Sequence, residues 1–192
     1  MTALIPPELA KAVEQARAKF AYHEDRQLDW SDRLPIWRAL GPPGDPEQAI
    51  LSPGWRRRAS LALACAETVM PFWTAREPRE PAQHLLRLAT CYQRGEAGQY
   101  ELWRAFDNFH AALEGMSGHP AILAGQTIAQ AAGVALFDEP LADETPHTLD
   151  PAGGAAECHA TLGADPAQAV SERSAFWNWY LRTAVKDAWN SL

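Results

Sequence analysis

Two groups of ionisable side chains have the residue types that catalysis or metal binding would require. Cys158 and His159 directly follow Glu157, and thiol, imidazole and carboxylate are the groups of a nucleophilic site. Adjacent side chains on a helix point about 100° apart, so this spacing does not bring the thiol to the imidazole. His110 and Glu114 are four residues apart, which can place two metal ligands on one helix face. Neither group completes a known catalytic pattern.

The remaining sequence offers little else for an enzyme. It contains no Gly-rich phosphate loop after a strand, no GxSxG motif and no HExxH motif. Cys65 and Cys91 lie on apolar helix faces, where a thiol is usually part of the core. We therefore predict a protein that is not an enzyme, with no catalytic residues, no metal site and no cofactor.

Charge and composition narrow the possible partners and the compartment. The 192 residues carry a formal charge of −7, whereas nucleic-acid binding needs a basic surface, so we expect no nucleic-acid partner. No apolar run reaches the ~20 residues of a membrane span, and the N-terminus does not resemble a secretory signal. Three widely spaced cysteines fit a reducing environment. These features predict a cytoplasmic protein with no membrane partner.

The charges are unevenly distributed along the chain. Between Arg104 and Arg173 there is no lysine or arginine. This interval is either a solvated acidic face or a docking surface for a basic partner, and charge alone leaves both open. Its ten acidic residues are Asp107, Glu114, Asp138, Glu139, Asp143, Glu144, Asp150, Glu157, Asp165 and Glu172.

Helical periodicity dominates, so the elements that position these residues should be helices. The sequence predicts an all-α fold, a single-domain bundle or an irregular array of antiparallel helices. A Pro- and Gly-rich break at 41–46 separates an N-terminal helical segment, residues 1–44, from a main helical domain, residues 45–192. We expect 138–154 to be a loop. The expected helices cover about 7–25, 31–40 (capped by Ser31), 53–73, 82–94 (after a turn at 76–81), 99–114, 119–137, 155–162 and 166–189.

Two features of the side chains need an explanation in any such fold. Arg56, Arg57 and Arg58 begin a helix, the end that cations do not favour, so they should be solvated or pair with carboxylates elsewhere. Trp177 and Trp179 are two residues apart on one helix and cannot both face the same core. One of them should lie at a boundary or an interface.

The order of residues from Arg57 to Gly95 resembles the immunity proteins of bacterial polymorphic toxin systems, in particular immunity family five and its relatives. The resemblance rests on an Arg-rich helix start, a small-residue run, a V-x-P-aromatic step, a Pro-Arg turn and a basic-Gly-Glu ending. These are Arg57-Arg58, Ala64-Cys65-Ala66, Val69-Met70-Pro71-Phe72, Pro78-Arg79-Glu80 and Arg94-Gly95-Glu96. It covers about the central and C-terminal two-thirds of the chain, and residues before about 51 show no match.

This resemblance implies a non-enzymatic inhibitor that binds a cognate toxin domain in the producing cell. A basic toxin would suit the acidic chain, because opposite charge raises the association rate. The toxin-binding residues that we predict are Asp138, Glu139, Asp143, Glu144 and Asp150.

Two other kinds of function stay open. The chain could be a small helical metal-dependent hydrolase using His110, Glu114 and His159, which metal analysis would detect. It could also be a structural, oligomerising helical module with Trp177 or Trp179 in a self-interface. We expect a monomer or a homodimer, and light scattering would distinguish them.

Overall fold

The computed structural model describes the chain except for residues 1–3, 46–50, 74–78, 115, 117–119 and 139–149. All regular elements among the described residues are helical, which confirms the all-α prediction. None of these helices has the length and apolar character needed to cross a membrane. The elements are α1 (Pro7–Tyr22), α2 (Trp30–Ala39), α3 (Pro53–Trp73), α4 (Arg79–Arg94), α5 (Gln99–Glu114), α6 (Ala121–Phe137), α7 (Pro151–Ala160), α8 (Pro166–Trp179), the π-helical turn η2 (Tyr180–Ala184) and α9 (Val185–Trp189).

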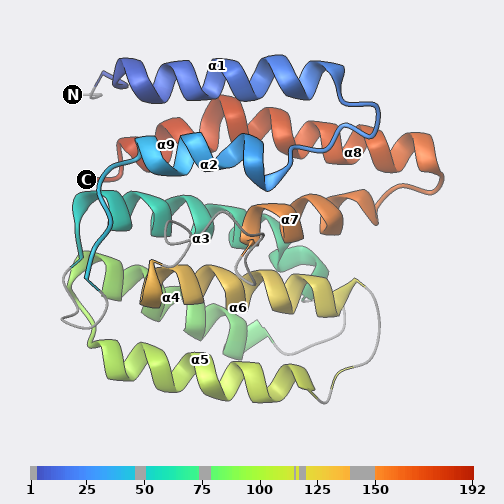
Figure 1. The fold of residues 1–192 in the computed structure, drawn as a ribbon. Coiled ribbons are helices and arrows are strands. Elements are labelled where there is room, and N and C mark those ends of the chain that lie inside the picture. The colour runs from blue at the N-terminus through green and yellow to red at the C-terminus, as the bar shows by residue number, and fades with distance from the viewer. Residues whose placement is uncertain (1–3, 46–50, 74–78, 115, 117–119, 139–149) are drawn as a thin grey trace.

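The helices lie side by side with similar axis directions, from α1 at one edge to α5 at the opposite edge (Figure 1). The helix α3 is central, because it packs against α4, α6, α7 and α9. The strongest pairing in the molecule is between α3 and α6. Helices α1 and α2 pack on each other beside α8, so the N-terminal segment covers one side of the array (Figure 1).

Small residues allow α6 to approach its neighbours closely. It is the most apolar helix. Nine of its buried residues are small: six alanines, two glycines and Thr127. A Cβ on Gly125 would lie 2.4 Å from Leu113 Cδ2 and 2.7 Å from Trp73 Cζ3. Only a glycine fits there without a shift of the Leu113 and Trp73 side chains, so the composition of α6 determines how tightly the centre packs.

Most helix boundaries agree with the sequence, because capping residues set them. Ser52 accepts the Trp55 amide at 3.0 Å and caps α3 as expected. Asp165 accepts the Gln168 amide at 2.9 Å and caps α8. Gly95 follows α4 with φ +78°, the left-handed conformation that ends many helices.

Four details differ from the sequence-based expectations. The helix α4 begins at Arg79, inside the expected turn at 76–81. The helix α2 begins at Trp30 with Asp29 at the N-cap position, not with a Ser31 cap, and Pro35 lies in its interior. The expected loop up to residue 154 is wrong at its end, because Asp150 caps α7 by accepting the Gly153 amide at 2.9 Å. The last helix is interrupted by η2, whose wider turn shows no sequence signal.

Candidate partner-binding surface and the ion pairs beside it

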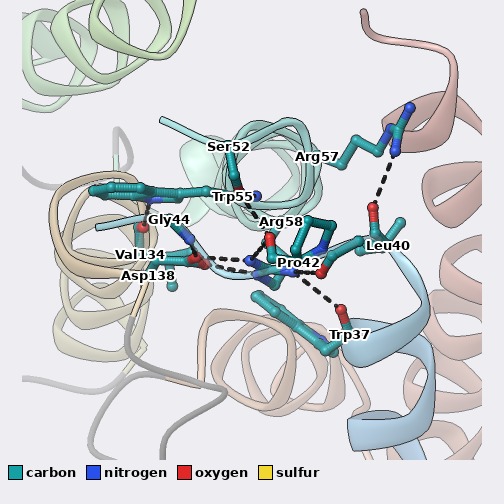
Figure 2. A network of polar contacts seen from close by, with 11 residues as sticks. Trp37, Leu40, Pro42, Gly44, Ser52, Trp55, Arg57, Arg58, Val134 and Asp138 are labelled. Carbon is teal, nitrogen blue, oxygen red and sulfur yellow. Dashed lines mark hydrogen bonds and ion pairs between the residues drawn. The ribbon is translucent and has the colours of Figure 1, made fainter. Parts of the chain in front are cut away.

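Arg58, on the second turn of α3, is completely buried and holds Asp138 at the end of α6. Its Nε donates to Asp138 Oδ1 and its Nη2 to Asp138 Oδ2, both at 2.6 Å (Figure 2). The same guanidinium donates to the carbonyl oxygens of Trp37 at 3.4 Å, Gly41 at 2.8 Å and Pro42 at 3.1 Å. A guanidinium has five N–H donors, and these contacts engage all three of its nitrogens.

The backbone conformation of Asp138, as well as its charge, fits it to pair with Arg58. Its φ of +46° ends α6 in the left-handed conformation, and its amide donates to the Val134 carbonyl at 3.2 Å. The Gly44 amide donates to Asp138 Oδ2 at 2.9 Å, and the Trp55 indole donates to the Val134 carbonyl at 2.9 Å (Figure 2). Each acceptor oxygen of the buried carboxylate thus has at least one donor, which a buried charge requires.

The backbone approaches α3 closely beside this pair. A Cβ on Gly54 would lie 2.3 Å from the Pro42 carbonyl oxygen, so only glycine allows the contact. The Ser52 hydroxyl donates to the same carbonyl at 2.7 Å. Arg57, which precedes Arg58 in the arginine run, donates to the Leu40 carbonyl at 3.1 Å (Figure 2). Arg57 and Arg58 therefore anchor the segment after α2, and Arg58 confirms the expected pairing with a distant carboxylate.

A second buried arginine, Arg33 of α2, holds Asp150 at the start of α7. Its Nη1 and Nη2 donate to Asp150 Oδ1 and Oδ2 at 2.5 and 2.6 Å, and its Nε donates to the Leu28 carbonyl at 2.9 Å. The guanidinium lies over the rings of Trp30 and Trp177, 5.4 and 5.1 Å from the ring centres. Burial alone would raise the pKa of Asp150, but the charge and hydrogen bonds of Arg33 bring that pKa below its usual value.

These contacts locate two of the five predicted toxin-binding residues. Asp138 and Asp150 are the described residues on either side of segment 139–149, and both carboxylates are bound by arginines. The side chain of Asp138 is 2% exposed and that of Asp150 is 32% exposed, so Asp138 is not on the surface. Glu139, Asp143 and Glu144 lie outside the described residues.

Other acidic residues of the cation-free interval also differ in their surroundings. Glu157 binds Arg173 at 3.1 Å and accepts the Gln27 amide at 3.3 Å. Asp107 and Glu114 are exposed on α5, and the exposed Asp165 caps α8. Cations from elsewhere in the chain therefore neutralise part of this interval, which is acidic in sequence but not one uniform acidic face.

Two of the three cysteines are parts of the core. Cys65 and Cys158 are buried, and burial raises the pKa of both thiols, that of Cys158 to about 12. Cys91 is only half-buried, so it lies at the edge of the core and not inside it as expected. His159 stacks on Phe176 with ring centres 5.4 Å apart, and burial lowers the pKa of its imidazole against an opposing effect of Glu172.

The residues of the hydrolase alternative are not assembled into a metal site in the described part of the chain. His110 and Glu114 are exposed on α5, His159 lies on α7 between aromatic rings, and no three metal-ligating side chains come together among the described residues. For the oligomer alternative, Trp177 is completely buried, whereas Trp179 is partly exposed at the edge of the core. Trp179 thus lies at a boundary, as expected for one of the two rings, but both rings contact Phe176, with ring centres 5.0 Å apart for Trp177 and 5.5 Å apart for Trp179.

Comparison with curated proteins gives no match. A family model described as "Immunity protein Imm5" matches residues 13–187, so the likeness includes α1 and α2 as well as the expected two-thirds of the chain. Both buried arginines and both of their aspartates lie inside the matched range. The chain belongs to the Imm5 family of immunity proteins.

Proposed function

We propose that this protein binds a cognate bacterial toxin domain and neutralises it by occupying its surface, without catalysis. The single observation that carries the proposal is the family match over residues 13–187. The surroundings of the two buried cysteines agree with it, because a thiol whose pKa is raised by burial is a poor nucleophile at neutral pH. We place this activity in the cytoplasm of the producing cell.

We propose that the toxin is basic and that the acidic segment of the chain contributes to its recognition. The formal charge of −7 favours a basic partner, since long-range attraction raises the association rate. The contacts that we propose come from Glu139, Asp143 and Glu144. Asp138 and Asp150 belong to the same predicted group, and their bonds to Arg58 and Arg33 suit them to fixing the ends of this segment.

The test is a binding measurement with the toxin domain encoded beside this gene. Charge reversal of Glu139, Asp143 and Glu144 together should lower the association rate by about ten- to a thousandfold at low salt. It should also reduce the dependence of that rate on ionic strength, because fewer charges steer the encounter. Surface plasmon resonance over a range of salt concentrations measures both effects.

The matched control reverses Glu67 on α3 and Asp107 and Glu114 on α5, three exposed carboxylates. Both variants change the net charge equally, so a general charge effect would slow association in both. An equal loss in both variants would refute the assignment to the acidic segment while leaving toxin binding intact. No binding of the toxin by the unaltered protein would contradict the proposed function itself.

A further inference from the structure

Three arginines line one hollow of this acidic protein. The hollow has a volume of about 440 Å³ and is lined by residues of α1, the turn after it, α8 and η2. Helix α1 lies at one edge of the molecule (Figure 1). Arg17 comes from α1, Arg26 from the turn and Arg182 from η2. Its other lining residues are Phe20, Ala21, Ser174 and Asn178.

Each arginine retains hydrogen-bond donors that no described residue accepts. Arg26 donates through Nη1 alone, to the carbonyls of Phe20 and Ala21 at 3.4 and 3.0 Å. Arg17 binds Glu14 through Nη1 at 3.0 Å and the Leu181 carbonyl through Nη2 at 3.3 Å. Its Nε is shielded from solvent and has no hydrogen-bond partner among the described residues.

Carboxylates do not balance these cations locally. Arg26 and Arg182 have no carboxylate oxygen within 4.0 Å among the described residues, and only Arg17 is in an ion pair, with the exposed Glu14. Bringing three guanidinium groups to one hollow costs electrostatic energy, most of all at low ionic strength. In a chain with 24 acidic and 17 basic residues, such a grouping is not explained by composition.

Two of the three arginines, Arg26 and Arg182, lie at irregularities of the backbone. Arg26 has φ +50°, a conformation that is uncommon for residues other than glycine, asparagine and aspartate. Arg182 lies within η2, and π-helical turns inside α-helices occur often at functional sites. Local strain of this kind persists where the surrounding structure maintains it, and it is concentrated at binding sites.

We propose that this hollow binds a small phosphate-bearing anion. Arginine recognises phosphate through several N–H donors at once, and a tetrahedral phosphate accepts donors from more directions than a planar carboxylate does. The hydroxyl of Ser174 and the amide of Asn178 can add neutral contacts beside the three cations. None of its lining residues belongs to the proposed toxin contacts, so this proposal does not depend on them.

Titration of the full-length protein with pyrophosphate, followed by calorimetry at constant ionic strength, tests this proposal. We expect saturable binding with a dissociation constant of about 1 mM or lower. Arg182→Gln should weaken it by about tenfold or more, because a charge-assisted contact is lost at an exposed side chain. Arg26→Gln is a second variant, and circular dichroism verifies that both remain helical.

The matched control is Arg87→Gln, which removes one exposed arginine from α4, away from the hollow. It should bind pyrophosphate like the unaltered protein. Acetate and inorganic phosphate are tested under the same conditions, and acetate should bind more weakly than either phosphate. Absence of saturable binding, equal responses to acetate and pyrophosphate, or equal loss in the Arg87 and Arg182 variants would each overturn the proposal.

Discussion

Arg58 and Asp138 show how a charged pair is accommodated in an aliphatic core. Removing two charges from water is costly, and their attraction compensates only when the remaining donors and acceptors are also satisfied. Here the backbone completes the pair, because the guanidinium also bonds three carbonyls and the carboxylate accepts the Gly44 amide. The pair therefore fixes the relative positions of α3, the end of α6 and the segment after α2.

Breaking this pair from either side should be costly. Arg58→Met leaves Asp138 charged and buried, and Asp138→Asn leaves Arg58 with an uncompensated charge. We expect each variant to lower the free energy of unfolding by about 3–5 kcal/mol. Asparagine tolerates the positive φ and keeps one acceptor oxygen, so Asp138→Asn removes the charge and one of the two bonds from Arg58 without straining the backbone. Urea denaturation measures both values.

The double variant separates the pair from its surroundings. Because the two residues are in contact, the loss in Arg58→Met with Asp138→Asn should be smaller than the sum of the single losses by about 0.5–3 kcal/mol. Glu157→Gln is the control, since its partner Arg173 lies at 3.1 Å and Glu157 is 45% exposed. It should cost no more than about 1 kcal/mol. Additive effects at Arg58 and Asp138 would contradict direct coupling.

His159 should make stability depend on pH. Burial lowers the pKa of its imidazole in the folded protein, and its shielded Nε2 has no hydrogen-bond partner among the described residues. Below about pH 6.5, the unfolded chain binds a proton that the folded chain binds less readily, so stability falls as the pH falls. This loss begins near the unfolded pKa and is complete below the lowered folded pKa.

The variant His159→Phe should reduce that pH dependence. Phenylalanine retains an aromatic ring between Phe72 and Phe176, whose ring centres lie 5.5 and 5.4 Å from that of His159. The difference in unfolding free energy between pH 7 and pH 5 should be smaller in the variant. The exposed His110 provides the control through His110→Phe. An unchanged pH profile in His159→Phe would show that other groups cause the acid sensitivity.

At the scale of elements, Gly125 allows α6 to pack closely on α5 and α3. Gly125→Ala would improve intrinsic helix propensity by about 1 kcal/mol, but its Cβ would overlap the Trp73 ring. We expect overpacking to cost about 1–3 kcal/mol and the variant to be less stable overall. Thermal unfolding measures the result. Gly98→Ala is the control, because nothing lies within 4 Å of a Cβ at that position. If Gly125→Ala raised the stability, the close approach of the helices at Gly125 would be disproved.

The helices were predictable wherever a local rule defines their ends. Ser52, Gly95 and Asp165 each act through neighbouring backbone groups, so sequence alone indicates their roles. The cap that Asp150 forms on α7 was not predictable, because residues 138–154 have the composition of a loop. The π-helical turn η2 was not predictable, since no residue type specifies it.

At the scale of the whole molecule, the sequence predicted the charge but not its pairing. Arg33 and Asp150 are 117 residues apart, and Arg58 and Asp138 are 80 apart. Charge patterning along the chain cannot reveal such contacts, because they depend on how α2, α3 and α6 pack. The arginine run at the start of α3 was the one available signal, and it indicated a distant partner without identifying it.

These long-range pairs argue that residues 1–44 and 45–192 unfold together. Arg33 in the first segment binds Asp150 in the second, and Arg58 in the second binds three carbonyls in the first. We expect one urea transition, with far-UV circular dichroism and tryptophan fluorescence coinciding. A chain of residues 45–192 alone would leave Arg58 without those carbonyls, and it should show lower helicity and no cooperative transition. Two separate transitions in the full chain, or a cooperative 45–192 fragment, would instead establish residues 1–44 as an independent segment.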